Sequence, residues 1–181
     1  MEQIKIIFFL VGSFFGIENS TIAADKTTVI IYPENQKIEI IQEKLFTIIQ
    51  SKKDTATTLA QWNKIANLRE NETPWAKELE HFTNKNLSIK NTGTTIETHI
   101  SLNYNDPNDL RAMGIWYNTD MHHFSINEVP RNHITSETGI LEDNYWIFND
   151  NNTFSFTTEA FLDLPNEYKK LKLPITAMLK K

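Results

Sequence analysis

The chain has 181 residues, a formal net charge of −5 and no cysteine. Its three arginines are scattered and no basic run is longer than two residues, so it lacks the clustered positive surface that nucleic acids and anionic membrane surfaces require. The absence of cysteine excludes a disulfide framework, a cysteine nucleophile and a lipid-modified cysteine anchor.

The N-terminal residues are typical of a secretory signal peptide. An apolar run from Ile6 to Ile17 follows Lys5, and small residues end at Ala23 and Ala24 before the first charged pair. This pattern predicts cleavage near Ala24, a signal peptide at residues 1–24 and a single domain at residues 25–181. The alternative is an uncleaved membrane anchor, although the run is shorter than the roughly 20 residues that span a bilayer as a helix.

A short β-branched run, TTVIIY at residues 27–32, precedes a region from Gln36 to Asn84 in which the sequence predicts three helices. Each predicted helix carries one apolar stripe with helical spacing. The three stripes are Ile38, Ile41, Leu45, Ile48 and Ile49; Leu59, Trp62, Ile65 and Leu68; and Trp75, Leu79 and Phe82. Asp54 or Thr55 could cap the second helix, and Thr73 with Pro74 begins the third.

From Leu87 onward the apolar period changes from that of a helix to that of a strand. Residues 96–104 alternate strictly, and the turn sequence NTG at residues 91–93 makes residues 87–104 a predicted hairpin. After a turn around Pro107, four further segments read as strands: GIWYN, HHFSINEV, NYWIFND and TFSFTTEAF. The last two suggest a second hairpin around NDNN. The C-terminal NEYKK begins as a helix that Pro174 limits.

Helices first and antiparallel strands second predict an α+β fold, with N-terminal helices packed on one face of a mostly antiparallel β-sheet. Cystatin-like and NTF2-like architectures share this order of elements. The likeness is an analogy at the level of element order and carries no function.

Catalytic chemistry has weak support in the sequence. There is no Gly-x-Ser-x-Gly, no glycine-rich phosphate loop and no His-Glu-x-x-His, so we predict no cofactor and no metal. Strand parity places His122 toward the core and His123 on the opposite face, which argues against a metal held by the adjacent pair.

The remaining catalytic candidates are His99, His123, Glu97 and Asp120. Glu97 and His99 are two residues apart on the polar face of a predicted strand, and His123 could lie across from them in a neighbouring strand. Such a set could transfer protons or bind zinc. The alternative is that these side chains are solvated sheet residues with no catalytic role.

Four aromatic residues are candidates for a binding surface. Trp116 and Tyr117 are neighbours in one predicted strand, as are Tyr145 and Trp146 in another. Because neighbours in a strand point to opposite faces, at least one member of each pair should leave the core. The alternative is that helices and the C-terminal segment cover both faces.

The leading hypothesis is an exported, soluble binding or accessory protein of the bacterial cell envelope, periplasmic or secreted. It would act through contacts with a protein or small ligand, as an inhibitor or immunity-type protein does, and not as an enzyme. The abundance of Asn, Ile and Lys suggests an AT-rich bacterial source. The competing hypothesis is a small hydrolase or metal-dependent enzyme that uses the histidine and carboxylate set, and a third is a self-associating structural component.

Overall fold

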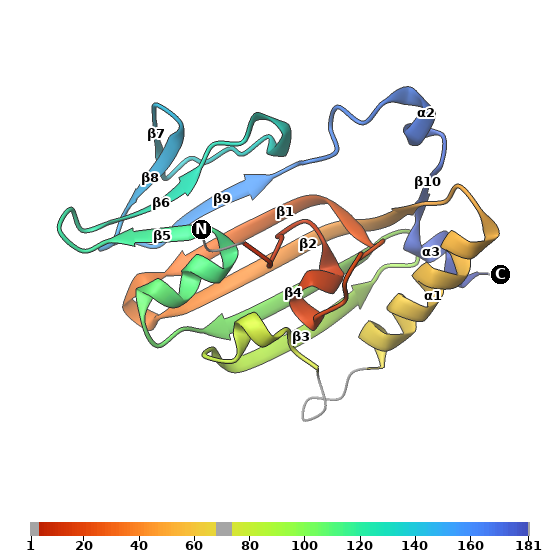
Figure 1. The fold of residues 1–181 in the computed structure, drawn as a ribbon, viewed down its shortest axis with the longest axis horizontal. Helices are drawn as coiled ribbons and strands as arrows, with labels where there is room; N and C mark the ends of the chain where they lie inside the picture. The colour runs from red at the N-terminus through yellow and green to blue at the C-terminus, as the bar shows by residue number, and fades with distance from the viewer. Residues whose placement is uncertain (1–3, 68–73, 181) are drawn as a thin grey trace.

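The computed structural model describes residues 4–67 and 74–180, which form two antiparallel β-sheets (Figure 1). The first sheet has the order β3-β4-β2-β1-β9, and β10 pairs with the far half of β2. Its strands are β1 (Ala23–Tyr32), β2 (Lys37–Ile48), β3 (Thr83–Asn91), β4 (Ile96–Asn103), β9 (Phe154–Thr158) and β10 (Lys172–Pro174). The second sheet has the order β5-β6-β8-β7, with strands β5 (Ile115–Asn118), β6 (His123–Asn127), β7 (Ile140–Glu142) and β8 (Tyr145–Asn149).

The described residues contain few helices, and these do not form a layer on one sheet face. The α-helices are α1 (Lys52–Ala66), α2 (Asn166–Lys169) and α3 (Ile175–Leu179). The 3-10 helices are η1 (Val11–Phe15), η2 (Pro33–Asn35), η3 (Lys77–Leu79), η4 (Pro107–Met113) and η5 (Pro130–Asn132). The predicted α+β fold with N-terminal helices packed on one face is therefore wrong, and the analogy with cystatin-like and NTF2-like architectures fails with it. The fold is mostly β.

The largest error concerns the first predicted helix, which is strand β2. Ile38 and Ile40 are buried and alternate with the partly exposed Glu39 and Ile41, as in a central strand between β1 and β4. The two-residue alternation ends at Lys44, which is exposed and has a positive φ of 53°. Beyond it Leu45, Phe46 and Thr47 are all buried, which breaks the two-residue period.

The other two helix predictions have different outcomes. The second is confirmed as α1, although Ser51 is the cap and Asp54 completes the capping box from the third helical position. In place of the third helix there is a single 3-10 turn, η3, followed by strand β3 from Thr83. Leu68 and Thr73, which the predictions also used, lie outside the described residues.

The predicted hairpin at residues 87–104 is confirmed as β3 and β4. Asn91 Oδ1 accepts a hydrogen bond of 2.8 Å from the Gly93 backbone N–H in the connecting turn. The buried residues of β4 alternate with partly exposed ones along its whole length. The alternation was readable because β4 has one buried face and one wet face.

The second predicted hairpin, around residues 150–152, is wrong. β8 stays in the second sheet, whereas β9 crosses to the edge of the first sheet and pairs with β1. The crossing joins the two sheets through an aromatic cluster. The Phe148 and Phe154 rings stack with centroids 4.5 Å apart, and Phe124 lies 5.3 Å from Phe154. The core therefore runs from one sheet to the other without a break.

Gly139 approaches this cluster too closely for any side chain. A Cβ at that position would lie 2.5 Å from the ring of Phe148, which is only 1% exposed. We therefore predict that Gly139→Ala lowers the free energy of unfolding by about 1–3 kcal/mol, because the buried ring has little room to move. Urea denaturation measures the change. The adjacent exposed position serves as the control: Glu137→Ala should stay within about 0.5 kcal/mol of the parent.

Candidate functional site

The outer face of the second sheet carries a row of side chains that is apolar on three of the four strands and has Ser125 on β6. In register, Trp116 faces Ser125, Ser125 faces Ile147, and Ile147 faces Ile140. Directly opposed residues of antiparallel strands share a face, so the row is continuous from β5 to β7. Ile140 is 66% exposed. The guanidinium of Arg111 lies 5.5 Å from the Trp116 ring centroid.

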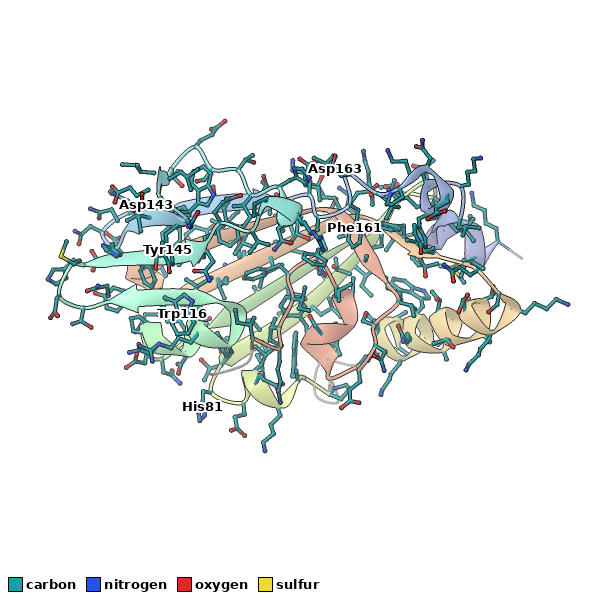
Figure 2. The ribbon with its side chains drawn as sticks, turned by 45° about the horizontal axis from the view of Figure 1, so that its top comes forward. His81, Trp116, Asp143, Tyr145, Phe161 and Asp163 are labelled. Atoms are coloured by element: carbon teal, nitrogen blue, oxygen red, sulfur yellow. The ribbon has the colours of Figure 1, made fainter. Side chains whose placement is uncertain are left out.

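Tyr145 extends this surface toward the β7–β8 turn. It lies beside Asn127 and Glu142 in register and is 48% exposed. Figure 2 labels Trp116 and Tyr145 on the strands of the second sheet, with Asp143 near Tyr145. We call Trp116, Tyr145, Ile147 and Ile140 the outer apolar row.

The other two predicted aromatics point to the inner side of the same sheet. Tyr117 packs on Phe124 with ring centroids 4.8 Å apart and donates a 2.8 Å hydrogen bond to Asp150. That hydrogen bond is the main reason why the pKa of the Tyr117 phenol is raised. Trp146 Nε1 donates to Glu128 Oε2 at 2.5 Å. Each predicted pair therefore sends one aromatic side chain to each face.

The four candidate catalytic residues do not meet. His99 and Glu97 lie on β4 in the first sheet, whereas His123 begins β6 in the second sheet. The expected approach of His123 to His99 across neighbouring strands is absent, because the two strands belong to different sheets. Glu97 lies opposite Lys90 of β3 in the strand register, and Asp120 is exposed in the β5–β6 turn.

The expectation that His122 points into the core is wrong. Its φ of 50° places it in the turn before β6 instead of in the strand, so strand parity does not apply to it. Its side chain is 73% exposed, with Nδ1 3.4 Å from Asp150 Oδ2.

His99 approaches a different carboxylate, that of Glu39 on β2. His99 Nε2 lies 3.8 Å from Glu39 Oε2, to which the Tyr32 hydroxyl donates at 3.2 Å. Lys37 Nζ donates to the other oxygen of Glu39. Burial favours a higher pKa for Glu39, but the hydrogen bonds from Lys37 and Tyr32 and the charge of Lys37 outweigh it, and that pKa is lowered. Glu39 is therefore a fixed anion, which suits ion pairing better than general acid chemistry.

Within residues 4–67 and 74–180, no group of three His, Cys, Asp or Glu side chains is placed to hold a metal ion.

A row of polar side chains, which the sequence reading missed, crosses the inner face of the first sheet. Thr158, Thr27, Gln42 and Thr98 oppose one another in register across β9, β1, β2 and β4. All four are buried, and Thr27, Gln42 and Thr98 are completely inaccessible. We call these four residues the buried polar row. Such a row in an apolar face needs hydrogen-bond partners, because an unpaired buried polar group is costly.

Two members of the buried polar row, Gln42 and Thr27, donate to one backbone carbonyl, whereas Thr158 Oγ1 donates to the carbonyl of Asn132 at 2.6 Å. Thr98 Oγ1 donates to Gln42 Oε1 at 2.7 Å, which orients the Gln42 amide so that its nitrogen points away from β4. Gln42 Nε2 then donates to the carbonyl oxygen of Phe8 at 2.7 Å, and Thr27 Oγ1 donates to the same oxygen at 3.2 Å. The inner face therefore presents two donors to a single neutral acceptor.

The segment that supplies this carbonyl lies within the predicted signal peptide. Residues 4–22 run over the inner face of the first sheet (Figure 1), and η1 contacts α1. Five of their apolar side chains are at most 3% exposed: Ile6, Val11, Phe14, Phe15 and Ile22. Each buried side chain of this size contributes about 1.5–3 kcal/mol, so together they rival the about 5–15 kcal/mol that stabilises a whole domain. The inner face therefore needs an apolar cover.

An open cavity already lies beside this segment, between it and the second sheet. Its volume is about 300 Å³. The lining residues are Ile4, Ile6, Ile7, Phe8, Phe9, Met113, Gly114, Ile126, Asn127, Val129, Asn132, Ile134, Phe156 and Thr158. None of these described residues carries a charge, so the cavity favours neutral, apolar groups.

The described parts of the chain contain no helix that is both long and apolar enough to cross a membrane.

Tyr104, which follows β4, has a buried hydroxyl with no hydrogen-bond partner among the described residues. Burial raises the pKa of this phenol to about 12. Because the folded-state pKa lies above the usual value of about 10, the protein should lose stability as pH rises from about 10 toward the folded-state value.

We predict that Tyr104→Phe leaves stability at pH 7 unchanged or raises it by up to about 1 kcal/mol, because the substitution removes an unsatisfied hydroxyl. The variant should also lose part of the alkaline decline in stability. Urea titrations of parent and variant at pH 8 and near pH 11 measure both effects. A loss of more than about 1 kcal/mol at pH 7 would show that the hydroxyl has a partner.

One signal could have revealed the buried polar row in the sequence. The run from Lys37 to Ile48 is rich in β-branched residues, which favours a strand over a helix. Read as a strand, it places Gln42 on the same face as Ile38 and Ile40. A polar residue on a buried face, matched by Thr98 on the buried face of β4, then predicts a hydrogen-bonded pair.

Comparison with protein-family models, with curated proteins and with solved structures gives no match, so function has to be inferred from the geometry of these surfaces.

Proposed function

We propose that the chain is an exported protein of the bacterial cell envelope that acts by binding a partner protein through the outer apolar row. The observation that carries the proposal is that Trp116, Ile147, Ile140 and Tyr145 share one sheet face, on which Ile140 and Tyr145 are exposed and the other two are half-buried. Exposed apolar side chains gathered on one surface are typical of an interaction site. Trp and Tyr contribute large contact areas at such sites.

The edge of the second sheet supports a particular mode of binding. β7 is the last strand in the order β5-β6-β8-β7, and its residues Ile140 to Glu142 are all exposed. An unpaired edge can accept an additional strand from a partner, with apolar side chains packed on the adjoining face.

The charges around this edge indicate the chemistry of the partner. Three exposed acidic residues lie at this edge: Glu142 in β7, and Glu137 and Asp143 near its two ends. A partner segment with apolar residues flanked by Lys or Arg would complement them, because charge complementarity steers association and fixes register.

The export part of the proposal is supported by the sequence pattern of residues 1–24. An intact mass of the protein recovered from the envelope fraction tests it. A chain that begins at Asp25 would support export with cleavage. A chain that retains residues 1–24 would contradict cleavage and leave residues 4–22 on the inner face of the first sheet.

Site-specific photo-crosslinking in living cells tests the binding part. A photoreactive phenylalanine analogue replaces Ile140 or Tyr145 in one set of strains and Ser101 in the control. Ser101 is a partly exposed residue on the outer face of β4, in the first sheet. We expect one discrete crosslinked product at positions 140 and 145 and none at position 101.

The partner is then identified by mass spectrometry of the crosslinked product, and Trp116→Ala should weaken its recovery. Equal crosslinking at all three positions, or none at any, would contradict a binding surface on the second sheet.

A further inference from the structure

We propose that removal of residues 1–24 during export opens a groove on the inner face of the first sheet, and that this groove binds an acyl chain of an envelope lipid. Gln42 Nε2 and Thr27 Oγ1 donate hydrogen bonds to the ester carbonyl of that chain. The inference rests on the export part of the proposed function and is independent of the outer apolar row.

The first step concerns what the groove offers once residues 4–22 have left. The Gln42 amide keeps its orientation, because its oxygen still accepts the 2.7 Å hydrogen bond from Thr98. Its nitrogen, which now donates to the Phe8 carbonyl, then points into an apolar space together with the hydroxyl of Thr27. Two buried donors with no acceptor demand a ligand oxygen.

The second step concerns the charge of the ligand. Both donors are neutral, and the described residues that line the adjoining cavity carry no charge. A carboxylate in this place would lose its hydration without gaining a cation, which is costly. A neutral carbonyl, such as the amide of Phe8 that occupies the place now, fits the donors without this cost.

The third step separates a lipid from a peptide. The side chains of the first sheet donate hydrogen bonds to only one carbonyl of the segment, that of Phe8. Several other polar groups of the segment are satisfied from within it, as where Ser13 Oγ binds both backbone groups of Ile7 and Ser20 Oγ accepts from Gly12. A foreign peptide would bring a donor and an acceptor at nearly every residue. An acyl ester brings one carbonyl on an apolar chain, which matches the two donors of the buried polar row. The Ala76 N–H and the Gln61 amide, which donate to Phe14 and Asn19, belong to the start of η3 and to α1, outside the first sheet.

The fourth step concerns space. The cavity of about 300 Å³ adjoins Ile6, Phe8 and Phe9, so their departure would merge it with the groove that residues 4–22 vacate. The merged space would be walled by both sheets, because Phe156 of the first sheet and Ile126 of the second sheet line the existing cavity. An apolar ligand would restore the cover that the inner face loses on cleavage.

The experiment begins from the full chain with a C-terminal tag, expressed in a Gram-negative host and recovered from its envelope. Intact mass establishes whether the chain starts at Asp25, and native mass spectrometry with solvent extraction identifies what copurifies. We expect a chain starting at Asp25 with about one acyl lipid per protein molecule.

Specificity for the carbonyl is tested with two probes of equal chain length, an ester-linked palmitoyl lysophospholipid and its ether-linked analogue. In exchange against the copurified lipid, which keeps the inner face covered, the protein should bind the ester about ten-fold more tightly, the effect of one or two buried hydrogen bonds. Gln42→Leu should abolish this preference and Thr27→Val should reduce it. Thr47→Val is the matched control, because Thr47 is buried but bonds to Thr58 of α1 and lies outside the buried polar row. If Gln42→Leu does not fold, the nearly isosteric Thr27→Val carries the test.

Three outcomes would overturn the inference, and they differ in what they mean for the proposed function. A chain that starts at Asp25 without lipid, or without preference for the ester, would overturn the inference and leave the proposed function intact. A copurifying peptide would replace the lipid as occupant. A chain that retains residues 1–24 would overturn the inference together with cleavage on export, because the groove would then stay filled by residues 4–22.

Discussion

Phe14→Ala in the unprocessed chain is expected to lower the free energy of unfolding by about 3–5 kcal/mol. Phe14 is completely buried in η1 on the inner face of the first sheet, and its backbone carbonyl accepts a 2.8 Å hydrogen bond from the Ala76 N–H. Truncation would leave a cavity where the segment meets the core. The protein should be produced without export, its full mass confirmed, and its stability measured by urea denaturation.

Ile4→Ala is the matched control for this prediction. Ile4 belongs to the same apolar segment but is 44% exposed, so its truncation should cost about 1 kcal/mol or less. If Phe14→Ala and Ile4→Ala had the same small effect, residues 4–22 would not form part of the folded core of the unprocessed chain.

The strands of the second half of the chain could be predicted because each has one wet face. The alternation in β4 and the opposite directions of Trp116 and Tyr117 follow from the two-residue period alone. The pairing of strands into sheets could not be predicted in the same way. The local sequence pattern of residues 145–158 does not indicate that β8 and β9 belong to different sheets. The assignment of each strand to a sheet depends on where the Phe148 and Phe154 rings pack.

The first half was harder to predict because β2 lies between two neighbouring strands and its alternation of buried and partly exposed residues ends at Lys44. Its apolar residues therefore satisfy a helical spacing as well as a strand spacing. Residues of the candidate site could likewise be predicted on strands with one exposed face and not on strand β2. Parity predicts only that at least one member of each aromatic pair leaves the core, and it does not say which. Gln42 escapes prediction because the spacing of the apolar residues in β2 favours a helix.

The apolar run in the N-terminal residues has two possible interpretations, a signal peptide and a segment of the core. A signal peptide and a core segment both need apolar side chains, and composition does not separate them. The structure pairs Ala23 and Ala24, at the predicted cleavage position, with Phe46 and Leu45 of β2. This stretch fills the core of a chain that is not cleaved, and the intact mass decides which chain is made.

Gln42→Leu in the unprocessed chain is expected to lower the free energy of unfolding by about 2–4 kcal/mol. Leucine keeps the approximate volume of the side chain but removes both of its hydrogen bonds. The Thr98 hydroxyl then loses its acceptor, and the Phe8 carbonyl keeps only the 3.2 Å hydrogen bond from Thr27. Buried groups left unsatisfied cost about 1–3 kcal/mol each, which exceeds the gain from a more apolar side chain.

Thermal or urea denaturation measures this loss, with Gln50→Leu as the matched control. Gln50 is exposed after the end of β2, so the same chemical change there should alter stability by about 0.5 kcal/mol or less. Gln42→Leu combined with Thr98→Val should recover part of the loss, because removing both partners of a buried hydrogen bond leaves fewer unsatisfied groups than removing one. A double variant no more stable than Gln42→Leu would mean that the Phe8 carbonyl, and not Thr98, accounts for the cost. In that case the interaction between the first sheet and residues 4–22 would be the dominant role of Gln42 in the unprocessed chain.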